Sequence, residues 1–107
     1  MSDDAIVVFM TAASGEEATR LAEMLVGAHL AACVQMLPEI ESVYRWQGKI
    51  ERSSEVLLIA KTTREKFDDL EREVRALHSY DTPEIVAVPI VIGSAPYLEW
   101  LSKAASS

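Results

Sequence analysis

The segment His78-Ser79-Tyr80-Asp81-Thr82-Pro83-Glu84-Ile85 brings an imidazole, a phenol and two carboxylates together within eight residues. Imidazole and carboxylate groups bind metal ions, and imidazole also exchanges protons near neutral pH. Polar side chains and proline are equally typical of turns that have no chemical role. The segment therefore supports three interpretations: a metal-ligand set, a proton-handling set, or a well-bonded connection between two elements.

A helical pattern precedes this segment and an apolar strand follows it. Thr62 to Glu65 has the spacing of a capping box, and the helix that it begins places His78 in its last turn. Ile85 to Ile92 is typical of a strand, and Pro89 within it predicts an edge position or a bulge. The apolar stripe of the helix consists of Phe67, Leu70, Val74 and Leu77.

The N-terminal third of the chain predicts a strand and a helix. Ala5 to Thr11 is a continuous apolar run that is typical of a strand buried on both faces. Ser14 and Glu17 have the spacing of a capping box, and the helix after them should end near His29. Its apolar stripe consists of Ala18, Leu21, Ala22, Leu25 and Ala28.

Two long extended stretches follow, Leu30 to Trp46 and Lys49 to Lys61, and Gln47-Gly48 joins them as a predicted hairpin turn. This turn makes Trp46 face Lys49 across the ladder. Tyr44 should then face Glu51 on the same side of the sheet. Pro38 must lie at a bend, a bulge or an unpaired edge, because it has no N–H to donate.

A short helix, Tyr97 to Lys103 with Pro96 near its first position, completes the order β-α-β-β-α-β-α. Two crossovers in this order predict an α+β, ferredoxin-like sandwich with helices on one face of a four-stranded antiparallel sheet. Strands of about 13 residues span roughly 43 Å, whereas a domain of this size has a radius of gyration of about 13 Å. The hairpin should therefore project beyond the subunit, and a second subunit is the simplest cover for its open edges.

Composition limits the classes of function. A chain of 107 residues predicts one domain, residues 1–107, and the net charge of −7 argues against nucleic acid as a partner. Cys33 is the single cysteine, which excludes an internal disulfide. The start of the sequence is acidic rather than basic and no apolar run is long enough to cross a membrane, so we expect a cytoplasmic protein.

Six motifs lie in order along nearly the whole chain: Leu30-Ala31-Ala32-Cys33-Val34, Pro38, Tyr44-Arg45-Trp46-Gln47-Gly48-Lys49-Ile50, Lys61-Thr62, the segment His78 to Ile85, and Tyr97-Leu98-Glu99-Trp100. Taken together, these motifs resemble the CutA family of divalent-cation tolerance proteins. The resemblance implies a single CutA-like domain that forms a tight homotrimer through its long hairpins, with an architecture similar to that of the PII signalling proteins. It also implies a role in tolerance to copper and other divalent metals, with no assigned reaction.

The resemblance also implies a metal site. Family members with a described copper site use a cysteine of the first strand and two adjacent histidines at the end of the second helix, and a nearby glutamate is also proposed. In this sequence Met10 stands at the cysteine position, Leu77 and His78 at the two histidine positions, and Glu84 at the acidic one. Because a thioether and one imidazole are a thin ligand set, copper or another divalent cation should bind weakly here.

Other readings of these residues remain open. Met10 and Cys33 also fit a plain apolar core, and His78 fits a helix C-terminus where it bonds a last-turn carbonyl. An enzyme is not expected, because the first turn has no arginine for an acylphosphatase-like anion loop and no nucleophile is paired with a base. The alternative function is a PII-like trimeric sensor whose small-molecule ligand lies between subunits. Its expected cleft residues are His78, Tyr80, Asp81, Lys61 and Trp46.

Overall fold

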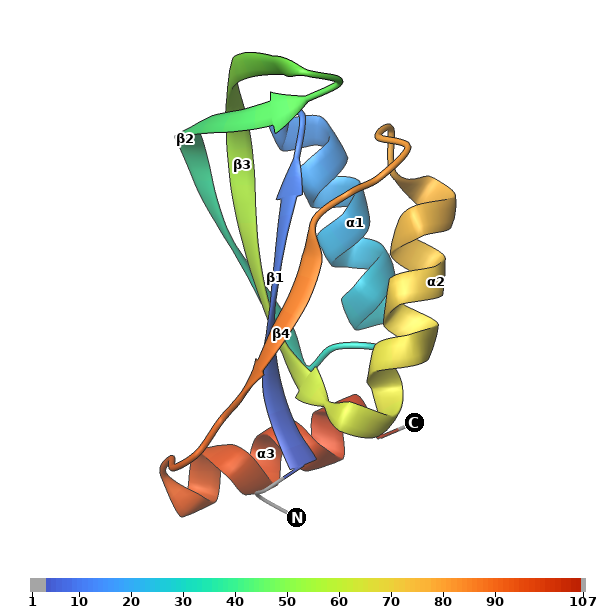
Figure 1. Cartoon of the computed structure of the whole chain (residues 1–107). Coiled ribbons are helices and arrows are strands. Elements are labelled where there is room, and N and C mark those ends of the chain that lie inside the picture. The colour runs from blue at the N-terminus through green and yellow to red at the C-terminus, as the bar shows by residue number, and fades with distance from the viewer. Residues whose placement is uncertain (1–3, 107) are drawn as a thin grey trace.

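A computed structural model describes residues 4–106 as a four-stranded antiparallel sheet (Figure 1). The first two helices pack on one face of the sheet, and the C-terminal helix packs against the other face at one end. The strand order is β2-β3-β1-β4, which confirms the predicted ferredoxin-like α+β fold. The elements are β1 (Ala5–Ala12), α1 (Gly15–Gly27), β2 (Cys33–Trp46), β3 (Lys49–Thr63), a 3₁₀ turn (Arg64–Lys66), α2 (Phe67–Leu77), β4 (Ile85–Pro89) and α3 (Ala95–Ala105). Within these described residues, no helix is long and apolar enough to cross a membrane.

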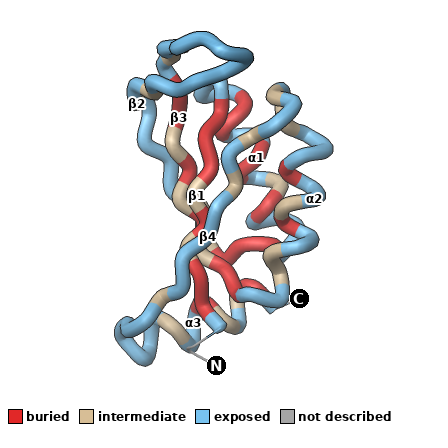
Figure 2. The backbone as a smooth tube through the Cα atoms, in the orientation of Figure 1, coloured by how far each residue is buried: buried red, intermediate tan, exposed pale blue. Residues whose placement is uncertain are grey.

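The core lies between the sheet and helices α1 and α2. Alternate residues of β1 face the helices, and Val8 and Met10 there are completely buried. Leu21 and Leu25 of α1 close over them at helical spacing. Figure 2 shows buried residues along β1 and the helix sides that face it, whereas β4 and the outer part of the hairpin are exposed.

The long hairpin has the predicted turn and register. Trp46 pairs with Lys49 and Tyr44 with Glu51, while Gln47 and Gly48 both have positive φ, as a tight hairpin turn requires. A β-bulge separates Leu37 from Ile40, which confirms the irregularity expected at Pro38. Beyond the bulge only β2 and β3 pair, so Ile40–Glu55 forms a two-stranded ribbon, and Figure 1 shows it bending across the end of the sheet toward the α2–β4 connection.

Three local predictions need correction. The capping box at Thr62–Glu65 does not form, because Thr62 and Thr63 still pair with β1 and a 3₁₀ turn without a side-chain cap precedes α2. Strand β4 ends at Pro89 rather than at Ile92, because its partner strand β1 begins at Ala5. The Ile90 N–H donates to the Ala5 carbonyl oxygen at 3.0 Å, and no later described residue pairs with β1. Helix α1 ends at Gly27, two residues before the predicted end.

Candidate functional site

A cleft lies between the bent hairpin ribbon and the connection from α2 to β4. Its volume is about 530 Å³, within the range of small-molecule sites. The end of β1 supplies its floor through Thr11, and the ribbon and the connection supply opposite walls. The remaining lining residues are Ser42, Val43, Tyr44, Trp46 and Glu55 of the ribbon and Tyr80, Asp81, Thr82 and Glu84 of the connection.

A hydrogen bond between Tyr80 and Glu55 ties the two walls together. The Tyr80 hydroxyl donates to Glu55 Oε2 at 2.7 Å, and Glu55 is buried. Burial, this hydrogen bond and the nearby negative charge of Glu55 all raise the pKa of Tyr80 above its usual range. Tyr80 is therefore a neutral donor in the cleft, and the charge there belongs to the carboxylates.

His78 lies behind Tyr80, with 4.8 Å between the two ring centroids, and its side chain is fully buried. Its Nε2 lies 2.7 Å from the Thr11 carbonyl oxygen, which can only accept, so Nε2 carries the proton. Its Nδ1 accepts the backbone N–H of Tyr80 at 3.0 Å. The partner of the ring is thus the β1 carbonyl and not a last-turn carbonyl of α2, and neither nitrogen has a free lone pair.

Glu17, which the sequence identified only as a capping residue, fixes the start of the same connection. As predicted, the Ser14 hydroxyl accepts the Glu17 N–H, but the Glu17 carboxylate accepts the N–H of Ala13 at 2.9 Å rather than that of Ser14. It also accepts the backbone N–H of Ser79 at 2.7 Å and the Ser79 hydroxyl at 3.1 Å. Burial alone raises the pKa of Glu17, but these hydrogen bonds bring the pKa below its usual range.

The structure places the predicted metal ligands Met10, His78 and Glu84 in three different environments. Met10 is completely buried on the helix side of the sheet, within the apolar core. His78 has both ring nitrogens engaged with backbone groups, and Glu84 lies in the cleft. Within residues 4–106, no three His, Cys, Asp or Glu side chains converge as a metal-ligand group.

The structure brings Tyr80, Asp81, Glu84 and Trp46 to one cleft and places Lys61 elsewhere. Lys61 pairs with Val7 and Cys33 toward the other end of the sheet and donates to Gln35 Oε1. A contribution of Lys61 to a cleft between subunits stays a prediction. Sequence reasoning missed Thr11 and Glu55, because Pro38 marks the irregularity in the ribbon but not the direction in which the ribbon bends, and that direction forms the cleft.

The fold and the cleft define a ferredoxin-like α+β protein with a ligand-sized opening beneath an overhanging hairpin. A family model described as "CutA1 divalent ion tolerance protein" matches residues 6–104. The chain therefore belongs to the CutA family, as its motifs predicted.

Relatives and solved structures agree with this membership. The divalent-cation tolerance protein CutA of Thermus thermophilus is 48% identical over 89% of this chain and 92% of its own length. The chloroplastic CutA of Arabidopsis thaliana is 49% identical, but the chain spans only 53% of its length. The solved structures of the Thermus thermophilus and Oryza sativa CutA1 proteins superpose with TM-scores of 0.92 and 0.93, at 46% and 45% identity. The first alignment covers 94% of this chain and 97% of the neighbour, and the second 96% and 94%.

Proposed function

We propose that this chain is a homotrimeric, non-enzymatic protein of divalent-cation tolerance whose working site is the cleft under the hairpin. The negative charge of the cleft is the main observation that supports a role in cation binding. Glu55, Asp81 and Glu84 line it, whereas none of its described lining residues is lysine or arginine. A cleft whose charged side chains are all negative attracts cations and repels anions.

Divalent metal ions bind weakly at this site, through the carboxylates of Asp81 and Glu84. Both residues are exposed on the connection, so each can contact a hydrated ion without displacing a partner. Tight binding is not expected, because no three-ligand group is built within the described residues. His78 positions the connection through its two backbone hydrogen bonds and does not bind the metal.

Zn²⁺ titration of ¹⁵N-labelled protein, followed by NMR, tests this assignment. The amide signals of the connection should shift, and the double variant Asp81→Asn/Glu84→Gln should weaken binding at least about threefold, from lost charge attraction. The control Asp68→Asn/Glu99→Gln changes the same charges at exposed positions outside the cleft and should bind as the wild type does. A large Zn²⁺-induced shift of the His78 ring nitrogens would move the site to the imidazole and overturn the assignment.

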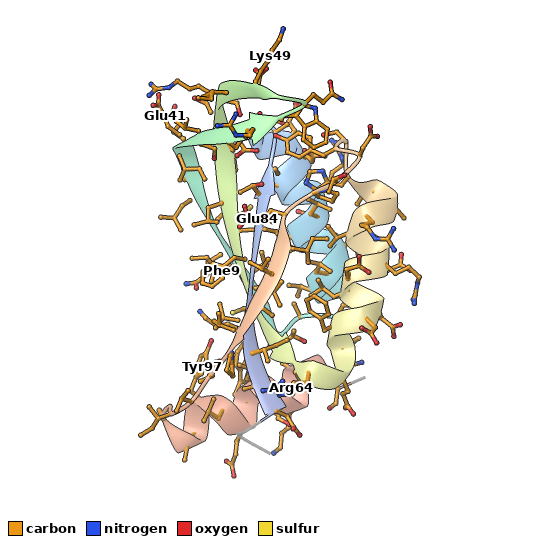
Figure 3. The ribbon with its side chains drawn as sticks, viewed as in Figure 1. Phe9, Glu41, Lys49, Arg64, Glu84 and Tyr97 are labelled. Atoms are coloured by element: carbon orange, nitrogen blue, oxygen red, sulfur yellow. The ribbon has the colours of Figure 1, made fainter. Side chains whose placement is uncertain are left out.

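Exposed apolar side chains on one face of the sheet support the proposed trimer. Alternation along β1 turns Phe9 away from α1 and α2, as Figure 3 shows, and register places Ile59 and Val86 beside it. Val86, Val88 and Leu37 on the same face are about half exposed. Copies of the chain that pack on this face would bury it, together with the unpaired edges of the ribbon.

Non-enzymatic function and a cytoplasmic location complete the proposal. The ring of His78 contacts backbone groups and no hydroxyl or thiol nucleophile, so the described site lacks a nucleophile paired with a base. A single cysteine is in keeping with a reducing compartment. Relatives differ in location, since the Archaeoglobus fulgidus structure is described as periplasmic and the plant proteins as chloroplastic. Cell fractionation with a tagged full-length chain tests the cytoplasmic location.

A further inference from the structure

The lining of the cleft is too apolar and too wide for a site that serves metal ions alone. In one protomer Tyr44 and Trp46 are 42% and 45% exposed, so each ring presents part of its surface to the cleft. Both line the cleft with Tyr80. Three aromatic side chains offer no ligand to a hard divalent cation, whereas their faces attract organic cations through the ring quadrupole.

Glu55 supplies a second, independent observation. It is 7% exposed, its Oε2 accepts the Tyr80 hydroxyl, and its Oε1 receives no hydrogen bond from the described residues. Within residues 4–106, no lysine, arginine or histidine lies within ion-pair distance of Glu55. Thr62 Oγ1 is the one buried side-chain polar atom without a hydrogen-bond partner among the described residues, so Glu55 Oε1 keeps contact with solvent in the cleft. Glu55 therefore presents a negative charge and a free hydrogen-bond acceptor on the inner wall of the cleft.

We infer that the cleft binds a small organic ammonium ion, with its cationic head between the aromatic faces and the carboxylates of Glu55 and Glu84. This inference rests on the cleft being the ligand site proposed above. The volume of about 530 Å³ accommodates such a molecule. Nucleotides and other anionic ligands, expected of a PII-like sensor, are disfavoured by the three carboxylates.

The test compares choline with its neutral carbon analogue, 3,3-dimethylbutan-1-ol, by NMR titration of the wild-type protein. The two molecules have almost the same shape and differ in charge. Choline should bind roughly tenfold more tightly and shift the amides of the ribbon and the connection, because only the cation interacts with the ring faces and the carboxylates. Equal affinity for the neutral analogue, or binding of ATP without binding of choline, would overturn the inference.

Two tryptophans give a matched pair of variants. Trp46 in the cleft and Trp100 on α3 are 45% and 47% exposed, so Trp46→Leu and Trp100→Leu remove similar surface. Trp46→Leu should weaken choline binding roughly tenfold, and Trp100→Leu should leave it unchanged. Equal losses in the two variants would show that the effect is not local to the cleft.

Zn²⁺ titration of the same variants separates this inference from the proposed function. Trp46→Leu should bind Zn²⁺ as the wild type does, because the ring is not a metal ligand. If Asp81→Asn/Glu84→Gln weakens Zn²⁺ binding while choline causes no shifts, the proposed function stands and the inference fails. If choline binds and Zn²⁺ does not, the inference stands and the metal role of the cleft fails.

Discussion

At the scale of single residues, Glu17 connects two parts of the chain that lie far apart in the sequence. Its carboxylate accepts hydrogen bonds from Ala13, before α1, and from both the backbone and the side chain of Ser79, after α2. It therefore joins the two helices at the end of the sheet where the cleft lies. The connection that carries Tyr80, Asp81 and Glu84 starts from this bonded point.

Replacing Glu17 by glutamine should lower the free energy of unfolding by about 2 kcal/mol, because the amide turns a donor toward at least one buried N–H. The folded-state pKa of Glu17 lies below 4.5, so the stabilisation by its charge is complete above pH 4.5 and is lost as the pH falls through the folded pKa. Urea unfolding at several pH values should show the wild type and Glu17→Gln converging in acid.

Glu16 offers the control, because it is exposed in the same turn and makes no such contacts. Glu16→Gln should change the free energy of unfolding by less than about 0.5 kcal/mol. A similar loss in both variants, or a Glu17→Gln penalty that does not change down to low pH, would contradict the role given to the carboxylate.

At the scale of elements, the bulge in β2 shapes the cleft. One extra residue between Leu37 and Ile40 bends the strand, and the ribbon beyond it carries Tyr44 and Trp46 over the α2–β4 connection. Glu39 accommodates the bulge with a φ of 62°, a left-handed conformation that is strained for residues with a Cβ. Glycine adopts this conformation freely.

Glu39→Gly should therefore be more stable than Glu39→Ala by up to about 1 kcal/mol, although glycine weakens ordinary strands. Glu41 lies on the same strand without a positive φ, and the order should reverse there, with Glu41→Ala more stable than Glu41→Gly. Comparing glycine with alanine at each position cancels the lost charge and the exposed ion pair of Glu41 with Arg52. Thermal unfolding of the four variants measures both differences, and the same order at both positions would contradict the strain at Glu39.

The sequence predicts the features of this structure that local patterns determine, and it misses those that depend on contacts between residues far apart in the chain. Hydrophobic periodicity and turn residues are local, and they predicted every strand and α-helix, as well as the hairpin register and the irregularity at Pro38. The sequence could not predict on which face of the sheet Met10 lies, because both faces of β1 are apolar and the packing of α1 and α2 decides which face they cover. Glu55 is 25 residues from Tyr80 along the chain, and only the bent ribbon brings them together.

At the scale of the whole molecule, the open face of the sheet is the surface through which we propose that the trimer forms. Val88 and Val26 are 46% and 44% exposed, but Val88 lies on the open face of β4 and Val26 on α1, outside the sheet. Val88→Glu should break the trimer into monomers at micromolar concentration, because a charge buried between subunits has no partner there. Val26→Glu makes the same change on α1, away from that face, so the variant should stay trimeric. Sedimentation velocity distinguishes the two states, and a monomeric wild type, or a trimer that Val88→Glu leaves intact, would refute assembly through this face.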